Sequence, residues 1–301
     1  MATPRRIWAC WLQGIDASPP VARACLASWR RHNPDWELRC LDATTVARYA
    51  PLTGVIDLSR QKLTAGSLAD VVRLLLLEAF GGVWVDATAL CERPLDDWLP
   101  QAAREGFFAF AAPGPGRPLS TWLLAAEPAN PLVVAWRRAV AAYWADRVAA
   151  DDYYWLHRRF AALIAADPGA AAAWRRVPKI SADGPHVLQA RALLARPAAE
   201  VEAAIDWTTP VFKLTRRLSL DCLAPGTLLT TLVEREIGLA AEGVSPPRSP
   251  LAAPRDPVAA RLAAIDRAAR SPAPPIGPIA PDDVLPPPSS PLPAQAGRGR
   301  G

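Results

Sequence analysis

Apolar and polar residues follow regular patterns through residues 1–244, and the start of the chain predicts a strand, a helix and a second strand. Residues 6–12 are apolar and aromatic, as in a buried strand. The helix begins at Pro19 or Pro20, where a missing amide proton costs nothing, and runs to about His32. Residues 36–42 alternate between apolar and polar positions, which is typical of a strand. This order predicts a parallel sheet with a right-handed crossover.

A second helix is predicted over residues 68–80. Ser67 is a candidate N-cap, because its hydroxyl can accept a hydrogen bond from an amide of the first turn. Apolar residues continue at helical spacing from 68 to 80. Asp70 and Arg73 are three residues apart, so the two charges share one face of the helix.

A glycine pair separates this helix from a short apolar run. Gly81 and Gly82 end the helix, because glycine readily adopts the left-handed conformation of a C-terminal cap. Residues 83–85 are apolar and suit a buried strand of a parallel sheet, and Asp86 follows at the carboxyl end. In open α/β sheets, ligands bind at this edge.

The rest of the pattern predicts one α/β domain over residues 1–244, with a mostly helical C-terminal part. We expect strands at 107–112 and 120–126 and helices at 131–149 and 152–165. Residues 245–301 hold 15 of the 33 prolines. Such a segment cannot bury enough apolar area to offset its ordering entropy, so we expect a disordered Pro/Ala-rich tail.

Composition narrows the class of protein. Apolar residues make up 51% of the chain, enough for a sizeable core, and the net charge is +5. The positive charge is spread among arginines without a dense Lys/Arg run, which argues against nucleic-acid binding. The five cysteines form no C-x-x-C pair, which favours a reduced, cytoplasmic protein. No signal peptide or membrane-spanning run is predicted, and peripheral association with the inner face of the cell membrane is left open.

The carboxylate at the end of residues 83–85, beside a helix carrying Asp70 and Arg73, suits a nucleotide-sugar site. Departure of a sugar diphosphate exposes concentrated negative charge. Asp86 offers a hard oxygen ligand for Mg²⁺ or Mn²⁺, which we expect as the cofactor. No P-loop, dinucleotide-binding or G-x-S-x-G motif appears.

Several motifs resemble one known family. The run Ala69-Asp70-x-x-Arg73 followed by G-G-V-W-V-D-A-T at 81–88 resembles the capsular polysaccharide synthesis glycosyltransferases, relatives of sugar-transferases with a DxD motif. The segments I-W-x-x-W-L-Q-G at 7–14 and Y-x-x-x-H-x-x-F at 153–160 add to the resemblance. It implies a GT-A-like fold, a mostly parallel sheet flanked by helices. Thr88 stands where the second aspartate of DxD would stand.

The resemblance also implies roles for individual residues. We predict catalytic roles for Asp86, Asp70 and Arg73. The predicted substrate-binding residues are Trp11, Gln13, Ser67, Asp70, Arg73, Trp155, His157 and Lys213, the last on the diphosphate. The predicted metal ligands are Asp86, Thr88 and His186.

The function implied is transfer of a sugar from a nucleotide-sugar donor to a bacterial polysaccharide or another glycan acceptor, free or lipid-linked. Retention of anomeric configuration is expected by resemblance. One alternative is a catalytically inactive GT-A-like domain that binds a glycan or scaffolds a complex, which Thr88 favours. A nucleotide-sugar hydrolase is a further alternative.

Each candidate also has a structural interpretation. Asp86 can serve as a turn residue, and Asp70 with Arg73 can form an ordinary surface ion pair. His186 follows Gly-Pro and can cap the next helix, and His157 can belong to helix packing.

Overall fold

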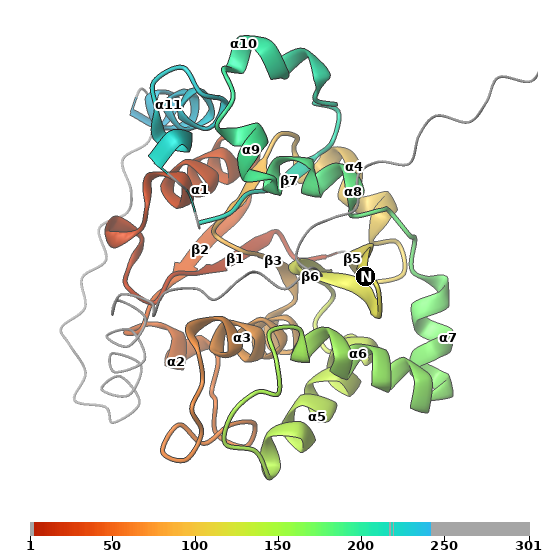
Figure 1. Cartoon of the computed structure of the whole chain (residues 1–301). Coiled ribbons are helices and arrows are strands. Elements are labelled where there is room, and N and C mark those ends of the chain that lie inside the picture. Colours follow the sequence, from red (N-terminus) through yellow and green to blue (C-terminus); the bar gives the residue numbers. More distant parts are fainter. Residues whose placement is uncertain (1–2, 217, 219, 242–301) are drawn as a thin grey trace, which may run out of the picture. The chain divides into compact units, whose positions relative to one another are not determined.

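The computed structural model describes residues 3–216, 218 and 220–241, and the predicted tail at 245–301 lies outside this range. Its centre is a five-stranded sheet with the order β2-β1-β3-β6-β5 (Figure 1). The strands are β1 Arg6–Cys10, β2 Glu37–Leu41, β3 Gly82–Val85, β5 Phe107–Gly114 and β6 Arg117–Ala126. Strands β1, β2 and β3 are parallel, and β6 is antiparallel to both β3 and β5. Four of the five strands therefore run the same way, as predicted for a mostly parallel α/β sheet.

Helices cover both faces of the sheet. Those of eight or more residues are α1 Pro20–His32, α3 Ala65–Phe80, α4 Leu95–Ala102, α5 Pro131–Ala145, α6 Trp155–Ala166, α7 Pro168–Arg176 and α11 Leu228–Ala241. The short helices are α2 Val46–Tyr49, α8 Asp183–His186, α9 Arg191–Leu194 and α10 Ala198–Val201. Helices α1 to α4 lie between the strands of the sheet along the chain, and the others follow β6. A second sheet pairs β4 Ala89–Cys91 with β7 Val211–Lys213. No helix among the described residues is both long and apolar enough to cross a bilayer.

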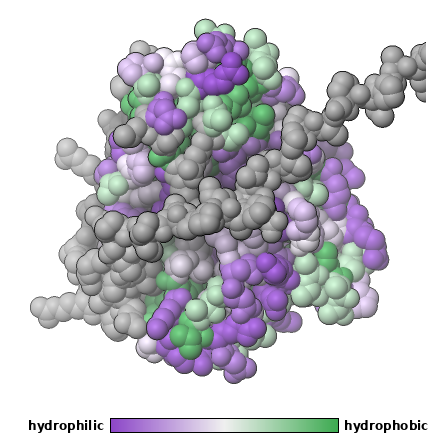
Figure 2. Space-filling model, in the orientation of Figure 1, coloured by the Kyte–Doolittle hydropathy of each residue, from purple (hydrophilic) through white to green (hydrophobic). Residues whose placement is uncertain are grey.

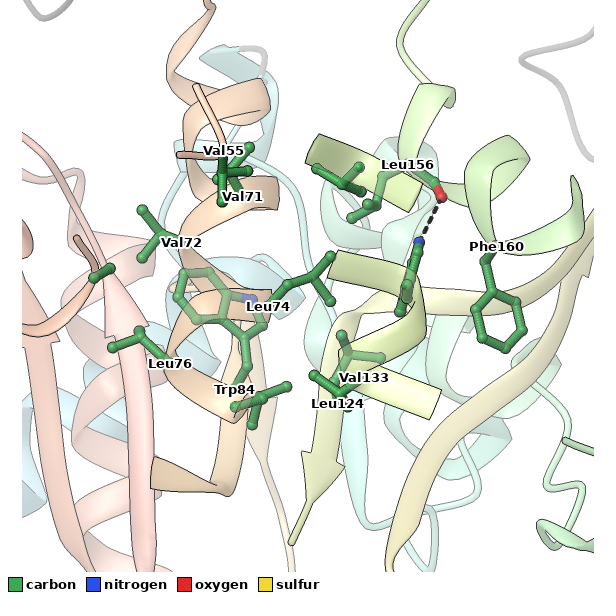
Figure 3. Packing of buried hydrophobic residues seen from close by; sticks show 14 of the residues in the cluster. Val55, Val71, Val72, Leu74, Leu76, Trp84, Leu124, Val133, Leu156 and Phe160 are labelled. Atoms are coloured by element: carbon green, nitrogen blue, oxygen red, sulfur yellow. Dashed lines mark hydrogen bonds between the residues drawn. The ribbon is translucent and has the colours of Figure 1, made fainter. Parts of the chain in front are cut away.

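Alternating side chains send the sheet's residues into two different cores. Trp8 and Trp84 pack with α3, α5 and α6 on one face, and Figure 3 shows this packing around Leu74 and Phe160. Their neighbours Ile7, Ala9, Val83 and Val85 pack with α1 and α4 on the other face. Successive residues of a strand point to opposite faces, so burial on both sides explains the continuous apolar runs at β1 and β3. Figure 1 shows α1 on one side of the sheet and α3, α5 and α6 on the other.

The outer surface is mixed in character. On the face shown in Figure 2, hydrophilic residues cover much of the layer formed by α5, α6 and α7, with small hydrophobic areas between them.

A buried acidic residue ties the C-terminal helix to the rest of the domain. The carboxylate of Glu236 in α11 is fully buried and accepts hydrogen bonds from Arg31 of α1 at 2.7 and 3.1 Å. Arg235 donates to Glu236 at 2.8 Å and pairs also with Glu92, which follows β4. The contact between α1 and α11 thus brings the small β4–β7 sheet against the first helix of the large sheet.

Two local details differ from the sequence-based expectation. Helix α3 begins at Ala65, and its N-cap is Thr64, whose hydroxyl accepts from the amide of Ser67 at 3.0 Å. Ser67 therefore lies inside the first turn and does not act as the N-cap, because the helix starts three residues earlier than predicted. The β4–β7 pair was not predicted, since three-residue strands carry too little periodicity.

Gly82 is a position where we expect replacement to destabilise the fold. Its φ is +95°, and a Cβ atom there would lie 2.5 Å from the carbonyl oxygen of Arg6 in β1. A left-handed backbone costs about 1–2 kcal/mol for a residue with a side chain, and overpacking adds about 1–3. Gly82→Ala should therefore lower the free energy of unfolding by about 3 kcal/mol, or the melting temperature by about 6–12 °C.

Gly238→Ala in α11 is the matched control for this thermal measurement. A Cβ atom at Gly238 meets nothing within 4 Å, so the change should be neutral or slightly stabilising. Equal melting temperatures for the two variants would contradict the steric argument at Gly82.

Candidate functional site

Asp86 is the centre of a charged cluster at the carboxyl end of β3. The guanidinium of Arg73, from α3, donates to Asp86 Oδ1 at 3.2 Å and contacts Asp70 Oδ1 at 2.7 Å. The indole N–H of Trp84 donates to Asp86 Oδ1 at 3.1 Å. The Arg73 side chain is only 5% exposed, whereas that of Asp86 is 31% exposed. Arg73 is therefore a buried bridge between two carboxylates. Asp86 is the most exposed of these three side chains, so it is the one that a ligand can reach.

The local sequence explains this arrangement. Trp84 and Asp86 are two residues apart on an extended strand and so point to the same face of the sheet. That face is covered by α3, which carries Arg73. The guanidinium lies 5.1 Å from the centre of the Trp84 ring, a cation–π distance. The alternation of the strand brings Trp84 and Asp86 to the same face, and the helical spacing brings Asp70 and Arg73 against them.

The second aspartate oxygen faces a lysine from the small sheet. Lys213 Nζ, at the end of β7, donates to Thr88 Oγ1 at 2.6 Å and to the carbonyl oxygen of Leu214 at 2.9 Å. It lies 4.0 Å from Asp86 Oδ2. The Lys213 side chain is 13% exposed. The β4–β7 pairing produces this contact, because Thr88 immediately precedes β4 and Lys213 ends β7.

Burial shifts the ionisation of two members of the cluster. Burial raises the pKa of Asp70 to about 7; Asp86 acts in the same direction, and Arg73 opposes it. Burial lowers the pKa of Lys213 below its usual value, while the Asp86 carboxylate opposes that effect. Both shifts indicate a site partly withdrawn from solvent, where charge–charge interactions are stronger than in water.

His186, the last residue of α8, contacts Trp122 of β6. The indole N–H of Trp122 donates to His186 Nε2 at 3.0 Å, so the imidazole carries its proton on Nδ1. Burial lowers the pKa of His186 to about 4, and Lys213 acts in the same direction, so the ring is neutral at pH 7. The carbonyl oxygen of Trp122 also accepts from the amide of Asp86 at 2.8 Å.

Two of the residues predicted as metal ligands already accept hydrogen bonds from other side chains in this arrangement. Thr88 Oγ1 accepts from an ammonium group, and His186 Nε2 accepts from an indole. Among the described residues there is no cluster of three or more His, Cys, Asp or Glu suited to a metal ion. Two unit charges 4 Å apart interact by about 4 kcal/mol near a protein surface, and a divalent cation beside Asp86 would face about twice that repulsion from Lys213.

The N-terminus of α6 brings the aromatic candidates close to the charged cluster. Trp155 is buried, and its ring stacks on that of Tyr143 at 5.2 Å. Its indole N–H is buried and makes no hydrogen bond to an acceptor among the described residues. It still lies close enough to Asp70 to lower the pKa of that carboxyl, against the larger raising effect of burial.

His157 lies two residues after Trp155 in α6. Its Nε2 is 3.5 Å from Thr121 Oγ1, and its Nδ1 is buried without a hydrogen-bond partner among the described residues. Burial lowers the pKa of His157 to about 3, and the charges of Arg73 and Arg117 add to the effect. His157 is therefore a neutral polar group near the cluster.

The remaining candidates lie further from Asp86 in the network of contacts. Trp11 and Gln13 follow β1, and the amide of Trp11 donates to the carbonyl oxygen of Leu41 at 2.8 Å. The hydroxyl of Ser67 lies 3.0 Å from that of Thr64 in the first turn of α3. Among the described residues, no hydrogen bond or ion pair joins these three side chains to the Asp86 cluster, so their predicted roles remain predictions.

Sequence reasoning overlooked three residues that shape the site. Trp84 looked like core, but its indole N–H holds Asp86, and the W-x-D spacing on a strand was the available signal. Trp122 positions His186 through a contact 64 residues distant in sequence, which no local pattern reveals. Arg117 stacks over the ring of Tyr154 at 4.2 Å, beside His157.

A shallow groove lies elsewhere, between α5 and α6. It encloses about 480 Å³ and is lined by residues that include Tyr143, Arg147 and Arg159. Its lining contains none of the residues predicted for the site, so the chemistry is better sought around Asp86.

Comparison with known proteins gives a consistent picture. Residues 1–232 match the sequence model of a family described as "Capsular polysaccharide synthesis protein". An O-glycosyltransferase, PaGT, of Phomopsis amygdali is 27% identical over 168 residues, which are 50% of this chain and 41% of the relative. The initiation-specific alpha-1,6-mannosyltransferase of Saccharomyces cerevisiae is 31% identical over 108 residues, or 33% and 22% of the two chains.

The chain spans less than half the length of these curated relatives. A solved structure titled "PaToxG Glycosyltransferase" is similar with 14% identity and a TM-score of 0.39, over 57% of this chain and 73% of that chain.

Proposed function

Because the chain belongs to the capsular polysaccharide synthesis protein family, we propose that it is a glycosyltransferase that moves a sugar from a nucleotide-sugar donor to a glycan acceptor. The names of the curated relatives, an O-glycosyltransferase and a mannosyltransferase, support the reaction class. The observation that carries the proposal is the Asp86 carboxylate, held by Arg73 and Trp84 at the carboxyl edge of β3.

In the proposed complex the donor diphosphate lies over the edge where β3 and β7 end. Lys213 supplies a cationic donor there, and an ammonium is well suited to a phosphate oxygen. Asp86 accepts a hydrogen bond from a hydroxyl of the ribose or of the transferred sugar. Arg73 is a positioning residue, since both of its terminal nitrogens are engaged by carboxylates.

The acceptor is proposed to approach from the N-terminus of α6. Tyr153 there is 77% exposed, and its ring contacts that of Tyr154 at 5.0 Å. Aromatic rings offer a flat apolar surface to the face of a pyranose. The proposed acceptor is a glycan, free or linked to a lipid. A lipid-linked glycan would bring the protein to a membrane surface. Retention of anomeric configuration is proposed by resemblance to the DxD sugar-transferases.

The test is a ligand panel read by thermal shift and by product formation. UDP, GDP, CMP and their common sugar conjugates are added singly, each with Mn²⁺ and with EDTA. A ligand at 100 times its Kd adds about 2.7 kcal/mol of stability, a shift of several degrees for a domain of this size. We expect one nucleotide class to shift the melting temperature and its sugar conjugate to be consumed only when a glycan is supplied.

Two outcomes would contradict this function. Binding of a glycan without any nucleotide would favour the inactive glycan-binding alternative. Consumption of the donor at the same rate with and without any glycan acceptor would favour a hydrolase.

A further inference from the structure

We propose that the ammonium group of Lys213 replaces the divalent cation in this site, so that the nucleotide diphosphate binds and the sugar is transferred without a metal ion. This inference rests on the proposed function and specifies how the site handles the charge of its substrate. It departs from the Mn²⁺ or Mg²⁺ that the motif resemblance implies.

The first observation is the position of the lysine head. Its Nζ is 2.6 Å from Thr88 Oγ1, at the place in the motif where DxD enzymes carry their second carboxylate. It is also 4.0 Å from Oδ2 of Asp86, the first carboxylate. The cation of this chain therefore stands between the two positions of the motif that would otherwise hold a metal.

The second observation concerns hydrogen-bond capacity. An ammonium has three donors and no acceptor. Two of its donors face the Thr88 hydroxyl and the Leu214 carbonyl, and Asp86 Oδ2, at 4.0 Å, lies beyond hydrogen-bond distance. One donor therefore remains for a further acceptor, and a phosphate oxygen would complete the set.

The third observation is the balance of charge. Asp70 and Asp86 face Arg73 and Lys213, so two acidic groups meet two basic ones before any ligand arrives. Threonine at position 88 adds an acceptor but no negative charge. A second aspartate there would leave an unmatched carboxylate and call for a further cation, whereas the threonine does not.

The role in the reaction follows from the bond that breaks. The bond between the sugar C1 and the diphosphate oxygen breaks, and its electron pair stays on that oxygen. The hydroxyl oxygen of the acceptor forms the new bond to C1, and its proton passes to the departing phosphate. Lys213 stabilises the charge that develops on the phosphate by donating a hydrogen bond to it.

The experiment measures the affinity of the wild-type protein for UDP and GDP by calorimetry, in EDTA and in Mn²⁺. We expect the Kd of the nucleotide that binds to differ by less than about threefold between the two conditions. Turnover of the matching sugar nucleotide should persist in EDTA. Tightening by tenfold or more with Mn²⁺, or loss of turnover in EDTA, would overturn the inference and leave the proposed function intact.

Variants separate the lysine from the fold. Lys213→Met should weaken nucleotide binding in EDTA by about tenfold to a hundredfold, the range for a hydrogen bond to a charged group. Lys62→Met is the matched control, because Lys62 is an exposed lysine outside the cluster and should leave the Kd unchanged. An unchanged Kd in Lys213→Met would overturn the inference.

The double variant Thr88→Asp with Lys213→Met restores the second carboxylate and removes the ammonium. We expect its nucleotide binding to become dependent on Mn²⁺, with at least tenfold tighter binding than in EDTA. Failure of the wild type to bind any nucleotide in either condition would instead contradict the proposed function itself.

Discussion

Replacement of Asp86 by asparagine is expected to reduce sugar transfer by roughly a thousandfold while leaving the domain folded. The side chain keeps its shape and can still accept the indole N–H of Trp84, but it loses the charge that faces Lys213. Loss of one preorganised electrostatic contact in an active site commonly costs a factor of about 10²–10³ in rate. Transfer is measured as release of the nucleotide, alongside the melting temperature.

Asp96→Asn is the matched control for this change. Its carboxylate also accepts from an arginine and an indole, Arg5 at 2.9 Å and Trp36 at 3.2 Å. The pair is exposed, so loss of its charge should alter neither turnover nor stability by a measurable amount. Near-normal transfer by Asp86→Asn, with a donor that the wild type uses, would contradict the assignment of Asp86 to the site.

Replacement of Arg73 by methionine is expected to have the largest effect on stability. The guanidinium lies between Asp70 and Asp86, so its removal leaves the largely buried carboxylate of Asp70 without its cation and deprives Asp86 of one of its two basic neighbours. Breaking a buried ion pair by removing one partner typically costs about 3–5 kcal/mol. The lysine variant should recover only part of this loss, because a single ammonium cannot span both carboxylates as the guanidinium fork does.

The destabilisation should depend on pH in a defined direction. Burial already raises the pKa of Asp70 to about 7, and Arg73 opposes that rise. Without Arg73 the pKa rises further, so protonated Asp70 is favoured in the fold relative to the unfolded chain. The loss of stability caused by Arg73→Met, relative to wild type, should then be smallest near pH 5 and grow as the pH rises above about 7, the pKa of Asp70 in the wild type.

Urea unfolding at about pH 5 and pH 8 measures this effect, and Arg137→Met supplies the control. Arg137 makes two hydrogen bonds to Glu78 of the same helix α3, at 2.7 and 2.9 Å, but both side chains are about a quarter exposed. Its removal should cost about 1 kcal/mol or less and vary little with pH. Equal losses for the two variants would contradict the special position of Arg73.

The sequence allows much of the large sheet to be predicted, because its elements are long and strongly periodic. The predicted strand at 6–12 and the helix ending at His32 match β1 and α1 closely, and 120–126 lies within β6. The Gly81-Gly82 break separates α3 from β3 as expected. The prediction succeeds here because hydrophobic periodicity and glycine punctuation agree.

The cluster is only half predictable, for a physical reason. Asp70, Arg73 and Asp86 lie within 17 residues, and helix and strand spacing bring them together. Lys213 meets Thr88 across 125 residues, through a sheet with two three-residue strands. Local pattern carries no information on such a pairing, so its chemistry, an ammonium on the threonine hydroxyl, became visible only in the folded chain.

The division between the two sheets has a consequence for how this site can change over time. Asp86 follows β3 of the large sheet and Arg73 lies on the adjacent helix α3, whereas Lys213 is supplied by the small β4–β7 sheet. The two basic neighbours of Asp86 therefore come from different sheets, which the short link from Asp86 to Ala89 joins. A substitution in the small sheet can therefore change the positive charge beside Asp86 without altering the large sheet or its core. Related proteins can in this way differ in the electrostatics of the site while keeping the same acid.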